Sequence, residues 1–493
     1  MEAEDRISGN LAENRRLMDR ILRTEKSFDI VYRPVKAAGR QAGFYFVDGM
    51  VKDEIMEKLQ EFFYHLKPED LPDGTKDGQK TAKEDQESSG GGEQAPWTAI
   101  PYVEVDAADS PGELARAVLC GSVSLFVDGI REAYIIDCRT YPARSVQEPD
   151  KDKVLRGSRD GFVETVVFNT ALIRRRIRDT DLVMEMLNAG ESSKTDIVLC
   201  YMEGRADPAL VEKLRSRING LEVDALTMNQ ESLAECIYHG KWFNPFPKFK
   251  YTERPDAAAA GILEGKVAVL VDNSPSAMLL PATLFDIMEE ADDFYFPPVT
   301  GTYLKISRFL IGMLTLFLTP LWLLLMQNPQ WIPPSLEFIK VREAVNVPLI
   351  LQLLILELSI DGLKLAAINT PSMLTTPLSV IAALVIGEFT VKSGWFNAET
   401  MLYMAFVSIA NYMQASYELS YAFKFMRILL LLLTWAFQAW GLAAGVVLLC
   451  ILVAGNKTVS GESYLYPLFP FDGRQLARRL LRRRISFEHM EKR

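Results

Sequence analysis

Two acidic side chains and one basic side chain stand close together in the most apolar third of this 493-residue chain. In the stretch LILELSIDGLK, Glu357, Asp361 and Lys364 follow one another at i, i+4 and i+7, so a helix places all three on one face. An ionised side chain that faces lipid costs at least about 2.5–3.5 kcal/mol at the centre of a bilayer. We therefore expect these charges to point at one another or at a watery path.

Two further acids lie in neighbouring apolar segments, at 377–395 and 400–421. Glu388 is followed by Lys392 at i+4, and Glu418 is preceded by Gln414 at the same spacing. One interpretation is a set of ion pairs that fixes the register of membrane helices. A second is an acid-lined path for cations, because the two acids of LILELSIDGLK would share a single lysine. A third places part of that stretch at the membrane interface on a short re-entrant helix.

A run of arginines and a TERPD phrase carry charge outside this third. The run comprises Arg174, Arg175 and Arg176. It is either a solvated helix face or a face that binds an anion or a partner protein. TERPD precedes a helical run, AAAAGILEGK, that leads toward the apolar third, and consists of Thr252, Glu253, Arg254, Pro255 and Asp256. We predict that Arg254 ties the preceding region to this connector by charge-assisted hydrogen bonds. A surface arginine at a turn is the alternative, and Arg215 serves as an ordinary helix-face arginine for comparison.

Two long uncharged runs flank the segments that carry these charged side chains. Phe309–Met326 contains 18 residues without a charge and Ile428–Gly455 contains 28, and both are long enough to cross a bilayer core of about 30 Å. The averages of 49% hydrophobic and 24% charged residues conceal this partition, since the first 300 residues are mixed. The sequence predicts an all-α polytopic membrane domain at residues 304–456.

The preceding residues have the pattern of a soluble α/β region. GFYFVDG predicts a strand before a helix in VKDEIMEKLQEFFYHL, and Asp128-Gly129 in SVSLFVDGIREAYIID predicts a hairpin. TDIVLCYMEG, a helix begun by Asp207-Pro208, and LEVDAL together predict a β-α-β unit with parallel strands. KVAVLVDNSPSAMLL predicts strand, turn and strand. We expect two small subdomains at 1–71 and 97–243, a flexible insert at 72–96, a connector at 244–303 and a basic tail at 457–493.

Several classes of function are disfavoured. The five cysteines form no CxxC pair, only three histidines are present, and no phosphate loop, GxSxG or HExxH motif occurs. No enzyme, cofactor or metal site is therefore predicted. The net charge of −10 does not indicate a nucleic-acid partner, because acids and bases are segregated along the chain.

The tail predicts an orientation in the membrane. It carries six arginines, which the positive-inside rule places in the cytoplasm: Arg474, Arg478, Arg479, Arg482, Arg483 and Arg484. Leu476, Leu480 and Leu481 share a helical face, so the tail is expected to lie on anionic lipid. The N-terminus lacks the apolar core of a signal peptide, so the N-terminal region is expected in the cytoplasm too. Both ends inside require an even number of spans. Since five apolar segments are visible, four spans are predicted. Lys424 and Arg427, just before the last span, would then lie outside, which conflicts with the positive-inside rule.

Two blocks of sequence resemble a known family. RGSRDGFVETVVFNTALIRRRIRD (156–179) and NPFPKFKYTERPDAAAAGILEGKVAVLVD (244–272) are similar to the signature blocks of the A subunits of GerA spore germination proteins. The likeness rests on Arg156, Arg159, Gly161, Phe162, Glu164, Asn169 and Ile173 to Arg176 in the first block, and on Pro245 to Pro247, Thr252 to Asp256 and Glu264-Gly265 in the second. It continues through FYFPPVTGTYLKISRF.

The resemblance implies a multi-pass component of the inner spore membrane that acts when a dormant spore germinates. Subunits of this kind work beside a transporter-like B subunit and a lipoprotein C subunit, and are thought to oligomerise and to form or gate a path for ion release. The alternative is a scaffold or signal-relay subunit that conducts nothing. A secondary transporter is disfavoured, because so few spans leave no room for inverted halves.

Overall fold

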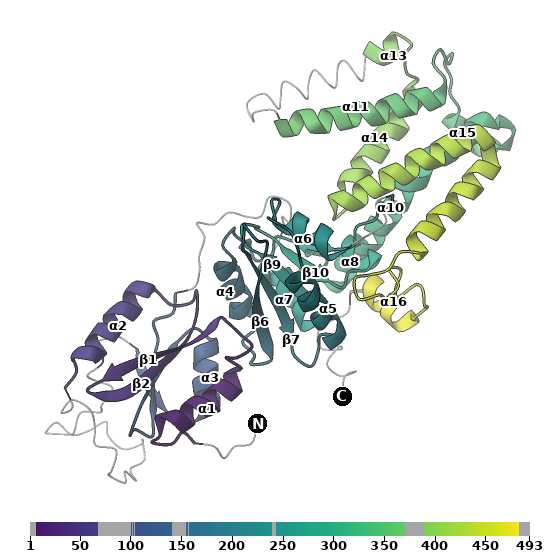
Figure 1. Cartoon of the computed structure of the whole chain (residues 1–493). Helices are drawn as coiled ribbons and strands as arrows, with labels where there is room; N and C mark the ends of the chain where they lie inside the picture. The colour runs from purple at the N-terminus through teal and green to yellow at the C-terminus, as the bar shows by residue number, and fades with distance from the viewer. Residues whose placement is uncertain are drawn as a thin grey trace. The chain divides into compact units, whose positions relative to one another are not determined.

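The computed structural model describes residues 6–67, 100, 102, 104–140, 154–155, 157–238, 243–369 and 389–482. The chain divides into two compact units. The first, called here the α/β unit, comprises Met1–His239 and Tyr251–Pro281, and the second, the helical unit, comprises Gly240–Lys250 and Ala282–Arg493 (Figure 1).

Two five-stranded sheets form the α/β unit. The first has the order β1-β2-β4-β5-β3 and the second β6-β7-β9-β10-β8. The strand pairs β1–β2, β2–β4, β4–β5, β3–β5, β6–β7, β7–β9 and β9–β10 are all antiparallel. The strands are β1 (Ile30–Ala37), β2 (Arg40–Val47), β3 (Val105–Ala108), β4 (Val123–Val127), β5 (Ala133–Ile136), β6 (Leu182–Ala189), β7 (Thr195–Met202), β8 (Lys250–Thr252), β9 (Val267–Val271) and β10 (Ala277–Leu280).

Helices cover these sheets and close their cores. In the first half, Met18, Leu22 and Val118 are buried with Tyr45 in one apolar cluster. In the second half, Ile173 and Ile262 are buried in another. The helices are α1 (Leu11–Leu22), α2 (Asp53–His65), α3 (Pro111–Leu119), α4 (Val166–Arg176), α5 (Pro208–Asn219), α6 (Gln230–Ile237) and α7 (Pro255–Leu263).

The locally encoded elements agree with the sequence predictions. Strands β4 and β5 form the predicted hairpin, and Gly129 takes the positive φ of 86° that its turn requires. The Asp207 side chain accepts a hydrogen bond from the backbone N–H of Ala209, and Pro208 begins α5. The β2 strand, the α2 helix and the β9–β10 hairpin also lie where they were predicted.

The predicted β-α-β unit is wrong. LEVDAL is not a strand, because its backbone bonds the turn between β6 and β7: Glu191 N–H donates to Val223 O (3.0 Å) and Ser192 N–H to Asp224 O (2.8 Å). Strand β7 instead pairs antiparallel with β6 and β9. The alternation of apolar and polar residues in LEVDAL suggested a strand, but in the described sheet no strand pairs with this segment.

The sheets do not follow the expected subdomain boundaries. Strands β3, β4 and β5, expected in a subdomain of their own at 97–243, complete the sheet begun by β1 and β2. Residues 251–281 of the expected connector are β8, α7, β9 and β10 of the second sheet. The expected insert at 72–96 lies outside the described residues.

The second unit is helical, as predicted. It contains α8 (Leu284–Met288), α9 (Asp292–Tyr295), α10 (Pro298–Gln327), the 3-10 helices η3 (Pro329–Trp331) and η4 (Pro334–Ile339), α11 (Leu349–Asn369), α13 (Thr390–Lys392), α14 (Ala398–Tyr412), α15 (Tyr417–Ala454) and α16 (Gly473–Leu480). Within the described residues, α10 and α15 are long and apolar enough to cross a membrane. The segment expected at 377–395 lies mostly outside the described residues.

The α15 helix folds back on itself. Gln438 has non-helical backbone angles (φ 51°, ψ −129°), and two arms meet there at a sharp bend (Figure 1). A Cβ added to Gly445 would lie 2.6 Å from Leu430 Cδ2, so the second arm packs closely on the first. The stretch 400–421, expected as one segment, is also broken, since α14 ends at Tyr412 and the Ser416 side chain caps α15.

Candidate functional site

An ion network is buried between α11 and α15 of the helical unit. Arg427 on α15 donates from Nε to Oε1 of Glu357 on α11 at 2.6 Å, and its Nη2 lies 2.6 Å from the same oxygen. Lys424, one turn earlier, bonds the Asp361 carboxylate and lies 3.6 Å from Glu357 Oε2. Glu357, Lys424 and Arg427 are each at most 4% exposed.

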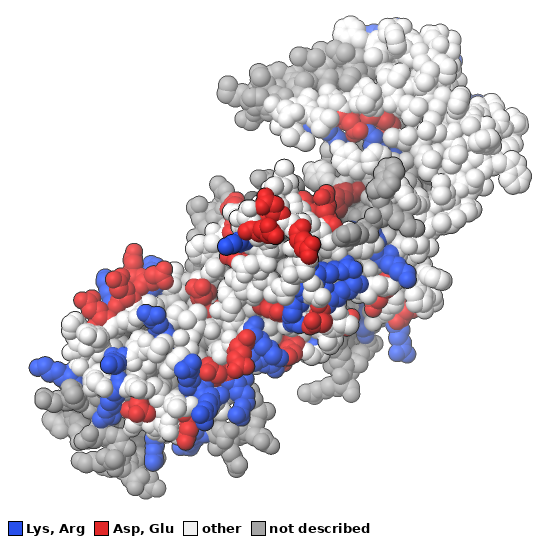
Figure 2. Space-filling model, viewed as in Figure 1, with Lys and Arg blue, Asp and Glu red and all other residues white. Residues whose placement is uncertain are grey.

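Backbone carbonyls complete the network. Lys424 Nζ donates to Glu357 O at 3.1 Å, and Arg427 Nη1 donates to Thr315 O of α10 at 3.1 Å. The network therefore joins three helices, α10, α11 and α15. Two acids meet two bases, so the four side chains carry no net charge. Figure 2 shows a small group of acidic and basic side chains in a largely uncharged part of the molecular surface, among the long apolar helices of the helical unit.

The predicted partnership with Lys364 is wrong. Its ammonium lies over the rings of Tyr412 (4.6 Å to the centroid) and Tyr421 (5.9 Å), while the two acids take their cations from α15. The reason is geometric. Lys364 is one turn beyond Asp361 on the same helix, whereas Lys424 and Arg427 face both acids across a helix interface. The premise of an acid excess at this place therefore fails.

Among the described residues, the other predicted acid, Glu418, lies outside this network. Glu418 lies exposed in the first turn of α15, and Gln414 precedes that helix, so the i, i+4 face expected for the two is absent. Glu388 lies outside the described residues. Among the residues that the structure describes, Asp361 Oδ1, Asn411 Oδ1 and both polar atoms of the Gln414 amide are buried without a hydrogen-bond partner.

A second group of ion pairs joins the first turns of α10 to α8, α9 and the tail. Lys305 bonds Glu289 at 2.5 Å, and Arg308 bonds Glu290 and Asp293, both at 2.6 Å. Arg479 of α16 lies 2.8 Å from Asp286. Burial of Glu289 opposes ionisation, but Lys250, Lys305 and Arg479 outweigh it and hold the pKa of this carboxyl below its usual range. This part of the tail thus contacts protein.

The predicted arginine face is mostly internal. Arg174 is fully buried and forms a two-pronged bond to Asp29, with Nε 2.7 Å from Oδ2 and Nη2 3.1 Å from Oδ1. Because Asp29 precedes β1 and Arg174 ends α4, this pair ties the two sheets together. Arg174 cannot bind a partner there. Arg176 bonds Asp160, and despite burial this holds the pKa of Asp160 below its usual range. Arg175 remains exposed.

The TERPD phrase meets the other signature block inside the α/β unit. Arg254 is 1% exposed, bonds Asp256 through Nε (3.1 Å) and Nη2 (2.6 Å), and donates to Ser158 O at 2.9 Å. The Phe162 N–H donates to Glu253 O at 2.8 Å. Thr252 is buried, and Pro255 begins α7. These bonds link α7, the helical run that follows TERPD, to the 156–179 block of the preceding region. Arg215 pairs with Glu185, so it is no plain helix-face control.

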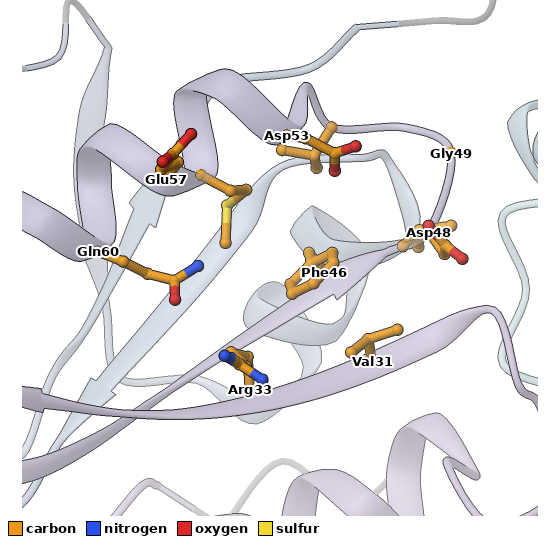
Figure 3. A pocket seen from close by; sticks show the side chains of 11 residues that line it. Val31, Arg33, Phe46, Asp48, Gly49, Asp53, Glu57 and Gln60 are labelled. Carbon is orange, nitrogen blue, oxygen red and sulfur yellow. The ribbon is translucent and has the colours of Figure 1, made fainter.

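A hollow of about 470 Å³ lies in the α/β unit between the first sheet and α2 (Figure 3). Its lining includes one cation, Arg33, and three acids, Asp48, Asp53 and Glu57. Burial raises the pKa of Asp48, and the carboxylates of Asp53 and Asp29 raise it further, against a backbone hydrogen bond from Gly49. The lining residues include no serine, cysteine or histidine that could act as a nucleophile or base. Across the described residues, no three His, Cys, Asp or Glu side chains gather as a metal site.

Comparison with known proteins identifies the family. A family model described as "Bacillus/Clostridium GerA spore germination protein" matches residues 18–493. The chain belongs to the GerA family. Among GerA relatives, stage V sporulation protein AF of Bacillus subtilis (strain 168) is 43% identical over 381 residues, which cover 77% of this chain and 76% of the relative.

Two further GerA likenesses are weaker. The uncharacterized membrane protein YfkQ of Bacillus subtilis (strain 168) is 29% identical over 471 residues, or 94% of this chain and 87% of the relative. The N-terminal domain of the A subunit of the Bacillus megaterium spore germinant receptor GerK3 is 25% identical, with a TM-score of 0.40, over 57% of this chain and 99% of that one. These names describe germination, sporulation and membrane proteins, and none describes an enzyme.

Sequence reasoning found the two acids of the network but missed its bases. Lys424 and Arg427 stand at i, i+3 in YAFKFMRILL and were assigned to the flank of a span. The available signal was complementarity. Two acids at i, i+4 on one apolar helix call for two bases at i, i+3 or i, i+4 on another.

Proposed function

We propose that this chain is a non-enzymatic membrane subunit of the spore germination machinery, with α10 and α15 in the inner spore membrane. Membership of the GerA family and the two long apolar helices support this placement. The arginines of the tail favour the spore-core side for the residues after α15. The α/β unit would then lie on that same side.

Its helical unit, we propose, forms or gates part of a path for cation release, and the Glu357 network carries this proposal. In the compact arrangement both acids are neutralised by Lys424 and Arg427. A movement of α11 away from α15 would free the acids to face water and cations. A buried charge left without its partner typically costs about 3–5 kcal/mol. The network would therefore keep the path closed until water or a partner protein compensates the separated charges.

Several copies of the chain would build the path, because one helical unit offers few helices. Large apolar side chains on its surface, such as Leu358 (74% exposed) and Trp440 (85% exposed), would face lipid or another copy. Other germination proteins of the spore membrane are the expected partners, alongside membrane lipid.

A non-conducting scaffold or relay subunit is the second candidate. The observation that favours it is that Glu357 and Asp361 are both paired with cations, since charge-neutral networks also serve only to fix helix register. In that case the α/β unit would pass a signal to a separate channel.

Ion flux through purified chain in liposomes distinguishes the two. Vesicles loaded with potassium or sodium should release cations in the presence of the chain if it conducts. Glu357→Gln with Asp361→Asn should reduce this flux, and adding Lys424→Met and Arg427→Met should restore stability without restoring flux. If the unaltered chain supports germination normally in spores but produces no ion flux in liposomes, the path is refuted and the chain is a scaffold or relay subunit.

Orientation has its own test. Single cysteines at Ser89 and Glu491, in a cysteine-free background, should resist membrane-impermeant thiol reagents in intact cells. Reaction of either one from outside would refute the cytoplasmic placement of that segment.

A further inference from the structure

A short apolar loop follows α15 and carries three exposed side chains. Leu468 is 49% exposed, Phe469 64% and Phe471 73%. Apolar side chains of this size gathered in one loop mark an interaction site.

The loop is held in shape by the helical unit. Tyr464 is fully buried against Phe246, and its carbonyl accepts from Leu284 N–H at 3.0 Å. Within the loop, Leu468 N–H donates to Leu465 O (2.7 Å) and Asp472 N–H donates to Pro467 O (2.9 Å). The three apolar side chains are therefore presented outward by a folded turn.

The position of the loop relative to α10 and α15 indicates which kind of surface it contacts. The loop leads into α16, whose Arg479 bonds Asp286, and Arg482 N–H after that helix donates to Thr302 Oγ1 near the start of α10 at 3.0 Å. The loop itself begins where the second arm of α15 ends. Among the described residues, both helices that are long and apolar enough to cross a membrane thus begin or end near the segment formed by the loop and α16.

The charged residues near the loop favour a lipid surface over a protein partner as its binding partner. Arg474 is exposed directly after the loop, and more arginines follow α16 in the sequence. Aromatic side chains beside arginines, at the ends of apolar helices, are the pattern of a segment that lies in a membrane interface rich in anionic lipid.

We infer that Leu468, Phe469 and Phe471 insert into the boundary between headgroups and acyl chains of an anionic bilayer, with Arg474 at the headgroups. This inference rests on the proposed placement of α10 and α15 in the membrane. It adds a separate anchor that fixes the depth of α10 and the second arm of α15.

Depth measurements on the full chain test it. Single cysteines replace Phe469, Leu432 or Tyr64 in a cysteine-free background and carry a nitrobenzoxadiazole label, in vesicles of phosphatidylcholine and phosphatidylglycerol. Leu432 is an exposed residue of the first arm of α15, and Tyr64 of α2 is as exposed as Phe471, at 73%. Quenching is measured with iodide in the water and with a nitroxide near the top of the lipid acyl chains.

The label at Phe469→Cys should be quenched by the nitroxide lipid, and by iodide at least about fivefold less than the label at Tyr64→Cys, because the interface excludes the anion. Iodide quenching equal to that at Tyr64→Cys would overturn the inference. Shielding from both quenchers would also overturn it, since protein would then cover the loop. Absence of lipid quenching at Leu432→Cys would refute the membrane placement itself, so the two failures are distinguishable.

Lipid charge supplies the second arm of the test. Without phosphatidylglycerol, iodide quenching at Phe469→Cys should rise. Arg474→Gln should produce part of that rise in anionic vesicles and none in neutral ones. Equal quenching in both lipids would overturn the role of anionic headgroups.

Discussion

Breaking the Glu357–Arg427 pair from one side should destabilise the helical unit more than removing the pair altogether. Arg427→Met leaves a buried carboxylate, and loss of one partner of a buried pair typically costs about 3–5 kcal/mol. Glu357→Leu with Arg427→Met removes both charges and fills similar volumes. Such replacements are often neutral or stabilising.

The distances set the size of the expected loss. At an effective dielectric constant of about 20, unit charges attract by roughly 6 kcal/mol at 2.6 Å and roughly 5 kcal/mol at 3.6 Å. After Arg427→Met, Lys424 still stands 3.6 Å from Glu357 Oε2 and retains part of the attraction. We therefore expect the lower end, a loss of about 3 kcal/mol. For a unit of this size that corresponds to a fall in Tm of about 6–12 °C. The double variant should recover most of it, because Lys424 keeps Asp361.

Tryptophan fluorescence during thermal unfolding in detergent reports this unit selectively. Six of the seven tryptophans belong to it: Trp242, Trp322, Trp331, Trp395, Trp435 and Trp440. Lys364→Met is the matched control. It removes a neighbouring cation that rests on tyrosine rings, where such contacts contribute about 0.5–2 kcal/mol. An unchanged Tm for Arg427→Met, or an equal loss in the single and double variants, would refute a stabilising ion pair.

Three further predictions concern other parts of the chain. Arg174→Ala should lower the free energy of unfolding by about 3 kcal/mol, because it strands Asp29, whereas Arg175→Ala should change it by less than about 0.5 kcal/mol; guanidinium unfolding followed by circular dichroism measures both. Arg254→Ala should cost about 2–3 kcal/mol in the same assay, with the exposed Lys58→Ala as control, and equal losses would remove the case for a structural tie. Burial lowers the pKa of Lys248 to about 8, so the folded chain releases this proton more readily than the unfolded chain. The resulting penalty is fully present below pH 8 and disappears as pH rises toward 10.5. Lys248→Met should therefore raise the Tm at pH 7 and flatten its increase above pH 8.

Features set by neighbouring residues could be predicted from the sequence. A positive φ at Gly129 and the cap at Asp207 depend on two or three adjacent residues, so the hairpin and α5 lie where they were expected. LEVDAL shows the limit of such reasoning. Its alternation is compatible with a strand, but a strand also needs a free edge at the right place, and that is decided by the whole sheet.

Partners distant in the sequence could not be predicted. Arg174 and Asp29 are 145 residues apart, and Arg427 and Glu357 are 70 apart. Spacing along one helix correctly placed Glu357 and Asp361 on a common face, and it also suggested Lys364 as their partner. The cation that pairs with a buried acid is decided by helix packing, which the spacing within one helix does not contain.

The bend at Gln438 resolves a conflict that the sequence left in the membrane topology. A continuous α15 of 38 residues would be about 57 Å long, nearly twice the bilayer core of about 30 Å. The first arm runs beside α10 in the same direction. Arg427, in the middle of the arm, donates to Thr315 O, and Gln327, the last residue of α10, donates to Trp435 O near the end of the arm.

The second arm reverses that direction and returns the chain to the end of the unit where α10 begins, which the contact of Leu284 with Tyr464 marks. If α10 crosses the bilayer, the segment after α15 emerges on the side from which α10 entered, whatever the path of the helices between them. The parity conflict came from counting the apolar run 428–455 as one span. Folded at Gln438, α15 provides two arms of opposite direction in place of one span. Five apolar segments in the sequence can therefore give an even number of crossings, which is compatible with an arginine-rich tail on the side from which α10 enters.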